Sequence, residues 1–329
     1  MQEIFFLSSR KLRTASRIIF YRNYSRKRDG DLARRLFNNA NDFIEQQLDS
    51  KLSELEKIFD AQAIAINGPI QDGLDDLIRS SIERRRENDE QGKALIVILT
   101  TQGGYVEVVK RIVETIRHYY YTVSFIVPNH AFSAGTVLVM SGDSIYMDYY
   151  SRLGPIDPQV QNSNGQFVPA LGYLVQWERL LKKAKEEELT LVELQLMLQG
   201  FDQAELYQYE QSRELSIALL KEWLAKYKFR NWRETDTLKE PVTDKMRQER
   251  AELIARQLND TGRWHSHGHG ISIDILQNEL KLKIDDFGSV ATTKESIRIY
   301  HSLMQDYMDK MRWSGAVHIV GDFLEYAGR

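Results

Sequence analysis

The sequence predicts an α/β protein, because strand-like and helix-like segments alternate between residues 61 and 169. KALIVILT, residues 93–100, is a continuous apolar run rich in β-branched residues, as expected for a strand buried on both faces. TVSFIVP and SIYMD follow as further strand-like runs, each preceded by helical sequence. This alternation favours parallel strands joined by right-handed crossovers.

Composition sets broad limits on the protein. The chain has 329 residues, of which 42% are hydrophobic, so it can bury a substantial core in one large domain or two ordinary ones. It contains no cysteine, which excludes disulfides, thiolate zinc sites and a cysteine nucleophile. The net charge is -3, so nothing in the overall charge attracts the chain to nucleic acid or to an anionic membrane.

The first 60 residues predict a basic arm followed by an amphipathic helix. Basic residues crowd the beginning of the chain: Arg10, Lys11, Arg13, Arg17, Arg22, Arg26, Lys27, Arg28, Arg34 and Arg35. The arm is either a solvated segment or a docking segment for a partner or a membrane surface, and we expect no specific nucleic acid. Between residues 31 and 61, apolar residues recur every three or four positions, which indicates a helix.

The core elements follow in order from residue 61. AIAIN predicts a first strand, and the turn GPIQDG leads to the charged helix LDDLIRSSIERRREND. The strand KALIVILT ends at Gly103 and Gly104, and YVEVVKRIVETIRHYY predicts the next helix. After TVSFIVP, the segment SAGTVLVMSG predicts a short apolar helix, and SIYMD predicts the following strand.

The character of the sequence changes beyond Pro169. Long charged helices are predicted near residues 170–229, 241–259, 271–281 and 291–311, with a loop at residues 230–241. We therefore divide the chain into the arm and helix of residues 1–60, an α/β core at 61–169, and a mainly helical part at 170–329. This last part is expected to pack on the core and to take part in oligomer contacts.

No segment has the length of a membrane span or the form of a signal peptide. The apolar pieces IFFL and IIFY are far shorter than the roughly 20 residues that a spanning helix needs. We expect a cytoplasmic protein, and leave open an association with a membrane surface.

Ser133 has two interpretations from its sequence context, Phe-Ser-Ala-Gly-Thr. It either caps a buried helix or acts as a nucleophile at the start of that helix. Amide hydrolysis also needs donors directed at the developing oxyanion. The N–H of Ala134 and a turn at Gly103 and Gly104 can supply such donors, because glycine allows close approach to the backbone.

Four stretches of the sequence carry a family resemblance. LTTQGGYVEVVKRIVETI, VSFIVPNHAFSAGTVLVMSGDSIYMD, SRLGPIDPQV and GRWHSHGHGI resemble the serine dehydrogenase proteinase family, which is related to signal peptide peptidase A and to the Clp protease proteolytic subunit. The resemblance runs from about Ala63 to about Phe287. It implies a ClpP/crotonase-like spiral of β-β-α units, with the N-terminal helical arm and long C-terminal helices added to it.

The resemblance also implies an activity and an assembly. It implies a serine endopeptidase that forms a homo-oligomer and acts on peptide or protein substrates without a cofactor. Ser133 takes the position of the nucleophile, and the N–H groups of Ala134 and of Gly103 or Gly104 would form the oxyanion hole. Two alternatives remain: a non-catalytic scaffold of the same fold, or a crotonase-type acyl-CoA enzyme, for which we find no paired glutamates on the active-site turns.

The catalytic base is open at this point. Asp157 stands where the Clp subunit has its histidine, but the normal pKa of an aspartate is about 3.9, so Asp157 fits an orienting or structural role better. Signal peptide peptidases use a lysine, for which Lys182, Lys183 and Lys185 are candidates in a charged helix. The remaining candidates are histidines, which need no large pKa shift. His267 matches a family histidine within the cluster His265, His267 and His269, a cluster that also has the spacing of metal ligands on an extended strand. His130 is interpreted as a local hydrogen-bonding residue.

Overall fold

A computed structural model of the chain describes residues 39–88, 94–156, 159–161, 167–200, 202–235, 239–264 and 270–328. The chain divides into two units at residues 47 and 48. The described part of the first unit begins helix α3, Ala40–Phe59, where Asn39 Oδ1 accepts the N–H of Asn41 at 2.8 Å. The helix predicted at residues 31–61 is thus confirmed over its described part. The basic arm lies outside the described residues.

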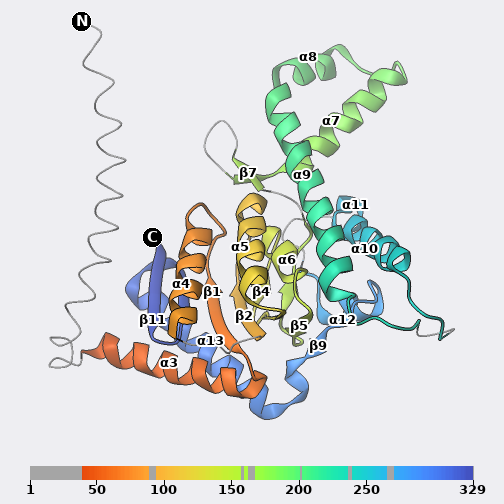
Figure 1. The fold of residues 1–329 in the computed structure, drawn as a ribbon. Helices are drawn as coiled ribbons and strands as arrows, with labels where there is room; N and C mark the ends of the chain where they lie inside the picture. The colour runs from red at the N-terminus through yellow and green to blue at the C-terminus, as the bar shows by residue number, and fades with distance from the viewer. Residues whose placement is uncertain are drawn as a thin grey trace, which may run out of the picture. The chain divides into compact units, whose positions relative to one another are not determined.

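The second unit is built around a seven-stranded sheet with the strand order β11-β10-β1-β2-β3-β5-β9 (Figure 1). Its strands are β1 Gln62–Asn67, β2 Ala94–Thr100, β3 Thr122–Ile126, β5 Ser144–Met147, β9 Asp285–Asp286, β10 Trp313–Ile319 and β11 Asp322–Gly328. Neighbouring strands from β1 to β9 are parallel, whereas β10 and β11 are antiparallel to their neighbours. The predicted parallel core is therefore confirmed.

Helices cover both faces of this sheet. One face packs against α4 Leu74–Asn88, α5 Val106–Tyr119 and α6 Ala134–Val139. Helix α9, Gln203–Trp223, packs on α5 and α6 and contributes to the same apolar core. The other face is covered by α13, Ala291–Met311, and by α3 from Leu48 onward (Figure 1). A chain of hydrogen bonds joins these last elements through β10: Tyr300 Oη lies 2.8 Å from His318 Nδ1, and His318 Nε2 lies 3.0 Å from Asp49 Oδ1.

A second, short sheet crosses the carboxyl ends of the main strands. It contains β4 His130–Ala131, parallel to β6 Arg152–Leu153. Bridges extend it to both sides, pairing Thr101 with Ala131, Ile70 with Gly104, and Leu153 with Ile271. A main strand, a short second-sheet segment and a helix thus recur in sequence, as in β1, Ile70 and α4. This is the spiral of β-β-α units that the family resemblance implies.

The chain beyond Pro169 is mainly helical, as predicted, and it also returns to the sheet. Its other helical elements are α7 Ala170–Lys185, α8 Leu191–Gly200, the π-helix η1 Leu224–Lys228, α10 Asp244–Leu258, α11 Thr261–Trp264, α12 Ile273–Asn278 and the 3-10 helix η2 Phe287–Ser289. A small hairpin, β7 Gln159–Gln161 with β8 Phe167–Pro169, precedes α7. Strands β9, β10 and β11 were not predicted. No described helix has the length and apolar character that a membrane crossing requires.

A glycine pair tests how tightly the β-β-α units pack. A Cβ built on Gly104 would lie 1.9 Å from the carbonyl oxygen of Ile70, whereas one on Gly73 would meet nothing within 4 Å; both glycines have positive φ, +147° and +91°. We therefore expect Gly104→Ala to lower the free energy of unfolding by about 1–3 kcal/mol more than Gly73→Ala does, measured by urea denaturation. Equal losses in the two variants would show that the units are loosely packed at this bridge.

Candidate active site

Ser133 lies at the turn between β4 and α6, with φ 52° and ψ -120°. A non-glycine residue rarely adopts positive φ, and such strained positions cluster at functional sites. Ser133 occupies the N-cap position of α6, but its side chain makes no capping hydrogen bond, and the residue is 1% exposed. The geometry therefore does not support the interpretation of this serine as an ordinary helix cap.

The glycine turn after β2 lies directly against the serine turn. A Cβ built on Gly103 would be 2.7 Å from the carbonyl oxygen of Phe132 and 2.8 Å from Ser133 Cβ. Gly103 itself has φ +105°. Glycine is needed here for its backbone conformation and for the close approach. The structure thus brings the turn at Gly103 and Gly104 into contact with the turn at Ser133.

The two glycines differ in what their N–H groups do. Gly103 N–H donates to Thr101 Oγ1 at 3.0 Å. The backbone groups on either side of Gly104 bond to Ile70. Ile70 N–H donates to Gly103 O, and Tyr105 N–H donates to Ile70 O, each at 2.9 Å. In an extended segment the N–H of the intervening residue points the other way. Among the described residues, the N–H groups of Gly104 and Ala134 have no hydrogen-bond acceptor.

Thr136 ties the serine turn to the loop that follows β6. Its buried Oγ1 lies 2.8 Å from Ala131 O and 2.9 Å from Gly154 O, and it accepts the N–H of Gly154 at 3.0 Å. A Cβ on Gly154 would touch Phe132, at 2.9 Å from Cδ1. The segment SRLGPI is therefore packed against the nucleophile turn.

Two candidate bases, Asp157 and His267, lie outside the described residues, as do His265 and His269. The nearest described residues contact the short sheet and the end of α10. Ile156 N–H donates to Leu258 O at 3.1 Å, and Leu153 and Ile271 exchange backbone hydrogen bonds of 3.1 and 2.7 Å. Strand β6, which ends four residues before Asp157, pairs with β4, and β4 leads to Ser133; Ile271, four residues after His267, pairs with Leu153 of β6.

The candidate lysines lie in the last turn of α7. Lys182 is paired with Glu186 at 3.8 Å and Lys183 with Glu193 at 2.5 Å. Lys185 is exposed. A lysine must be desolvated before it can act as a base near neutral pH, and none of the described contacts of this single chain buries Lys185.

Two histidines lie near the glycine and serine turns, and one of them was not predicted. His130 Nε2 lies 3.0 Å from Gln102 Nε2, and burial lowers the pKa of His130. His301, on α13, lies 3.1 Å from Thr100 Oγ1 through its Nε2 atom. The local hydrogen-bonding role predicted for His130 agrees with this geometry. The sequence around Ser133 gives no indication of His301, because His301 lies 201 positions after its partner Thr100.

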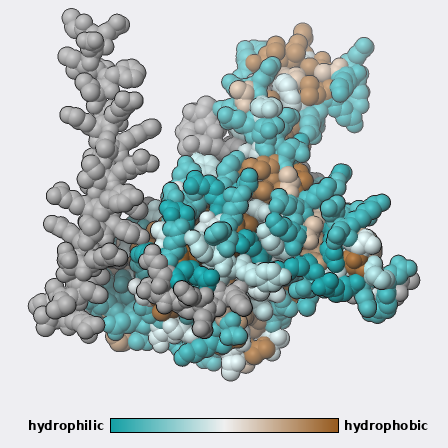
Figure 2. Space-filling model, in the orientation of Figure 1, coloured by the Kyte–Doolittle hydropathy of each residue, from teal (hydrophilic) through white to brown (hydrophobic). Residues whose placement is uncertain are grey.

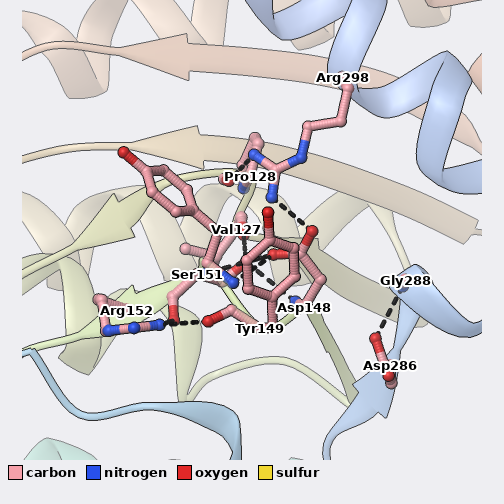
Figure 3. A network of polar contacts seen from close by, with 10 residues as sticks. Val127, Pro128, Asp148, Tyr149, Ser151, Arg152, Asp286, Gly288 and Arg298 are labelled. Atoms are coloured by element: carbon pink, nitrogen blue, oxygen red, sulfur yellow. Dashed lines mark hydrogen bonds and ion pairs between the residues drawn. The ribbon is translucent and has the colours of Figure 1, made fainter.

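Asp148, at the end of β5, is the centre of a buried polar network (Figure 3). Its Oδ1 accepts the N–H groups of Tyr150 at 2.9 Å and Ser151 at 3.2 Å, and its Oδ2 is paired with Arg298 of α13. Burial opposes ionisation of Asp148, but the hydrogen bonds from Arg298 and Tyr150 outweigh it and lower the pKa of the carboxyl group. The network joins α13 to the segments around the nucleophile turn.

Within the described ranges, no three histidine, aspartate or glutamate residues are grouped so that they could hold a metal ion. The histidine cluster for which a metal role was considered lies outside those ranges.

Curated relatives share parts of this sequence. One uncharacterized protein of Methanocaldococcus jannaschii is 31% identical over 98 residues, which are 30% of this chain and 32% of the relative. A second uncharacterized protein of the same organism is 27% identical over 229 residues, which are 69% of this chain and 63% of the relative. The chain thus spans about a third of the first relative and somewhat less than two thirds of the second.

Similar solved structures are proteases. A serine-to-alanine mutant of the membrane-bound stomatin-specific protease 1510-N has a TM-score of 0.40 at 15% identity, covering 70% of this chain and 82% of that one. A lysine-to-alanine mutant of the same protease with a substrate peptide has a TM-score of 0.40 at 17% identity, covering 68% and 73%. ClpP1 from Listeria monocytogenes has a TM-score of 0.36 at 12% identity, covering 69% and 92%.

The family match covers the segment that forms the candidate site. It runs from the first turn of α4 to just beyond η1, which directly continues α9, and it includes the glycine turn, Ser133 and Asp157. The resemblance seen in the sequence is thereby confirmed for residues 77–231, which match the family described as ClpP-like SDH-type serine proteinase.

Proposed function

We propose that this protein is a serine endopeptidase in which Ser133 is the nucleophile. The observation that carries the proposal is the strained backbone of Ser133 against the glycine turn, with a side chain that does not cap α6. A match to a serine proteinase family over the same residues supports it. The substrate class is peptide or protein, and the reaction needs no cofactor.

The N–H groups of Gly104 and Ala134 are our choice for the oxyanion hole. Both belong to turns that meet at Ser133, since a Cβ on the neighbouring Gly103 would lie 3.4 Å from Ala134 N. Gly103 is the weaker candidate because its own N–H is bonded to Thr101 Oγ1. Fixed backbone donors of this kind stabilise the charge that develops on a carbonyl oxygen during attack.

The proposed reaction has two steps. Ser133 Oγ attacks the peptide carbonyl while a base takes its proton, and the amine leaves with a proton returned by that base. Water then attacks the acyl-serine ester, releases the carboxylic acid and restores the serine. Each step produces an oxyanion at the same place, so one pair of donors serves both.

His267 is our first choice of base, with Lys185 and Asp157 as alternatives. The case for His267 is that Gly270, three positions later, packs against Arg152 of β6, where a Cβ would lie 2.8 Å from Arg152 Cδ. Strand β6 is the neighbour of β4, which leads to Ser133. Three residues of extended chain span roughly 10 Å, which is about the distance from one strand to its second neighbour in a sheet.

Ser133→Ala is expected to abolish labelling by a fluorophosphonate probe and cleavage of an unstructured protein substrate. The matched control is Ser141→Ala, which removes a buried hydroxyl near the other end of α6 that donates to Leu138 O at 2.6 Å. This control should label at close to the wild-type rate. Labelling that persists in Ser133→Ala would exclude Ser133 as the nucleophile.

Base variants in the same assay separate the remaining alternatives. Loss of labelling in His267→Ala alone, with Lys185→Ala and Asp157→Asn active, would support our first choice. Wild-type protein that neither labels nor cleaves would favour the scaffold alternative. Turnover of an acyl-CoA thioester without modification of Ser133 would favour the crotonase-type enzyme.

We also propose that the protein forms a homo-oligomer through α8. This short helix is rich in apolar residues, and five of them are between 40% and 84% exposed: Leu191, Val192, Leu194, Leu196 and Leu198. Figure 2 shows apolar surface gathered over this helix. A contiguous exposed apolar surface of this kind is typical of an interaction site.

Charge favours a second copy of the chain over an anionic membrane as the cover. Lys182 and Lys185 at the end of α7 are exposed, but so are Glu186, Glu187 and Glu188, which come directly before α8, and Asp202, which comes after it. The surface around α8 is therefore not basic, and an anionic membrane would be a poor cover. A second copy of the chain would offer α8 a matching apolar surface, packed about a two-fold axis.

The double variant Leu191→Gln, Leu198→Gln is expected to lower the mass measured by sedimentation velocity to that of a smaller species. The control Leu253→Gln changes a residue of α10 that is 45% exposed and should leave the mass unchanged. An unchanged mass in the α8 variant would exclude this helix as the interface.

A further inference from the structure

The segment that leads into the nucleophile turn is held at every carbonyl group from Val127 to Ser133. The donors, in order, are Ser151 Oγ at 2.6 Å, Arg298 Nη1 at 2.5 Å, Arg152 N at 2.8 Å, Thr101 N at 3.0 Å, Thr136 Oγ1 at 2.8 Å, Gly135 N at 2.8 Å and Thr136 N at 2.9 Å. A strained residue persists only where its surroundings over-determine its conformation. These hydrogen bonds supply that restraint.

Arg298 is the donor that comes from farthest along the chain. It lies on α13, 170 positions from Pro128, whose carbonyl it binds. Its other terminal nitrogen is paired with the carboxylate of Asp148, which is completely buried (Figure 3). One guanidinium thus fixes the end of β5 relative to the segment that enters β4.

His301 adds a second contact from the same helix, one turn after Arg298. Its Nε2 atom lies 3.1 Å from Thr100 Oγ1, at the end of β2 and just before the glycine turn. Burial, helped by the positive charge of Arg298, lowers the pKa of His301 to about 4, so the ring is neutral at pH 7. Helix α13 therefore contacts the lead-in segments of both turns that form the site.

We propose that Arg298 is a positioning residue for the hydrolytic reaction. Through its contacts with Pro128 and Asp148, it holds the Ser133 turn in place relative to the oxyanion donors. The inference rests on the proposed function, since it assigns Arg298 a part in that reaction. It also places a determinant of activity outside residues 77–231, the part of the chain that matches the proteinase family.

The two partners of Arg298 explain why an arginine is needed at this position. Its planar fork directs two N–H groups to acceptors on different segments, whereas a lysine offers one compact charge and cannot fix both. Lysine would keep the ion pair with the buried Asp148 and lose the bond to the Pro128 carbonyl. Small displacements of a nucleophile can lower rates by large factors while leaving the fold intact.

The test uses Arg298→Lys in the full-length protein, with Arg247→Lys as the matched control. Arg247 makes the same kind of contact in another place, donating to Phe229 O at 3.1 Å and to Trp232 O at 2.9 Å. Fluorophosphonate labelling is resolved into probe affinity and maximal rate, and hydrogen exchange is followed in the peptide that spans residues 128–137. Thermal denaturation verifies that both variants are folded.

For Arg298→Lys we expect a maximal labelling rate that is roughly 10- to 100-fold lower, with probe affinity nearly unchanged and faster exchange in residues 128–137. For Arg247→Lys we expect wild-type values of all three quantities. A merely structural role would lower the melting temperature without changing the labelling rate of the folded protein. A wild-type maximal rate in folded Arg298→Lys would therefore overturn the proposal.

The exchange measurement keeps this inference distinguishable from the proposed function. If the wild-type protein does not label, the peptidase proposal and the catalytic assignment of Arg298 both fail. Faster exchange confined to residues 128–137 in Arg298→Lys would then still show that Arg298 holds this turn. Unchanged exchange would reject that part as well.

Discussion

The backbone of Ser133 is the constraint on which the site depends. At φ 52° and ψ -120° a serine costs about 1–3 kcal/mol of strain, and this cost must be met by the rest of the structure. The neighbouring carbonyl groups are all bonded, and each such bond contributes on the order of 1 kcal/mol. The side-chain donors are Ser151 and Thr136 from nearby segments and Arg298 from α13. Contacts from segments well beyond the turn therefore hold Ser133 in its strained conformation.

The β-β-α architecture explains why the parts of the site meet. Each unit ends its main strand at the same edge of the sheet and then adds a residue or two to the short sheet. Successive units thus place their turns side by side, and the turn at Gly103 and Gly104 contacts the turn at Ser133. Any side chain at the two glycines would collide with Phe132 or Ile70, so the close approach depends on them. The arrangement of the candidate active site is thus a consequence of how the units stack.

Local patterns predicted the elements around the site, and long-range contacts decided the details. The apolar run of β2, the glycine turn and the short helix α6 were predicted because period and turn chemistry are local properties. Which glycine keeps a usable N–H depends on the hydroxyl of Thr101, and the sequence left that choice open. Strand β10 was not predicted. It pairs with β1, about 250 positions earlier along the chain, and local sequence patterns do not indicate such a pairing. Arg298 and His301 were missed for the same reason.

The strain at Ser133 can be measured directly by comparing two variants at one position. Glycine adopts this conformation without penalty and costs only about 0.5–1 kcal/mol in chain entropy, so Ser133→Gly should be more stable to urea than Ser133→Ala by about 1 kcal/mol. At Ser141, which does not have a positive φ, the corresponding pair should show the opposite order. If Ser133→Ala proves as stable as Ser133→Gly or more so, the turn is not strained, and the account of a nucleophile held by its surroundings is contradicted.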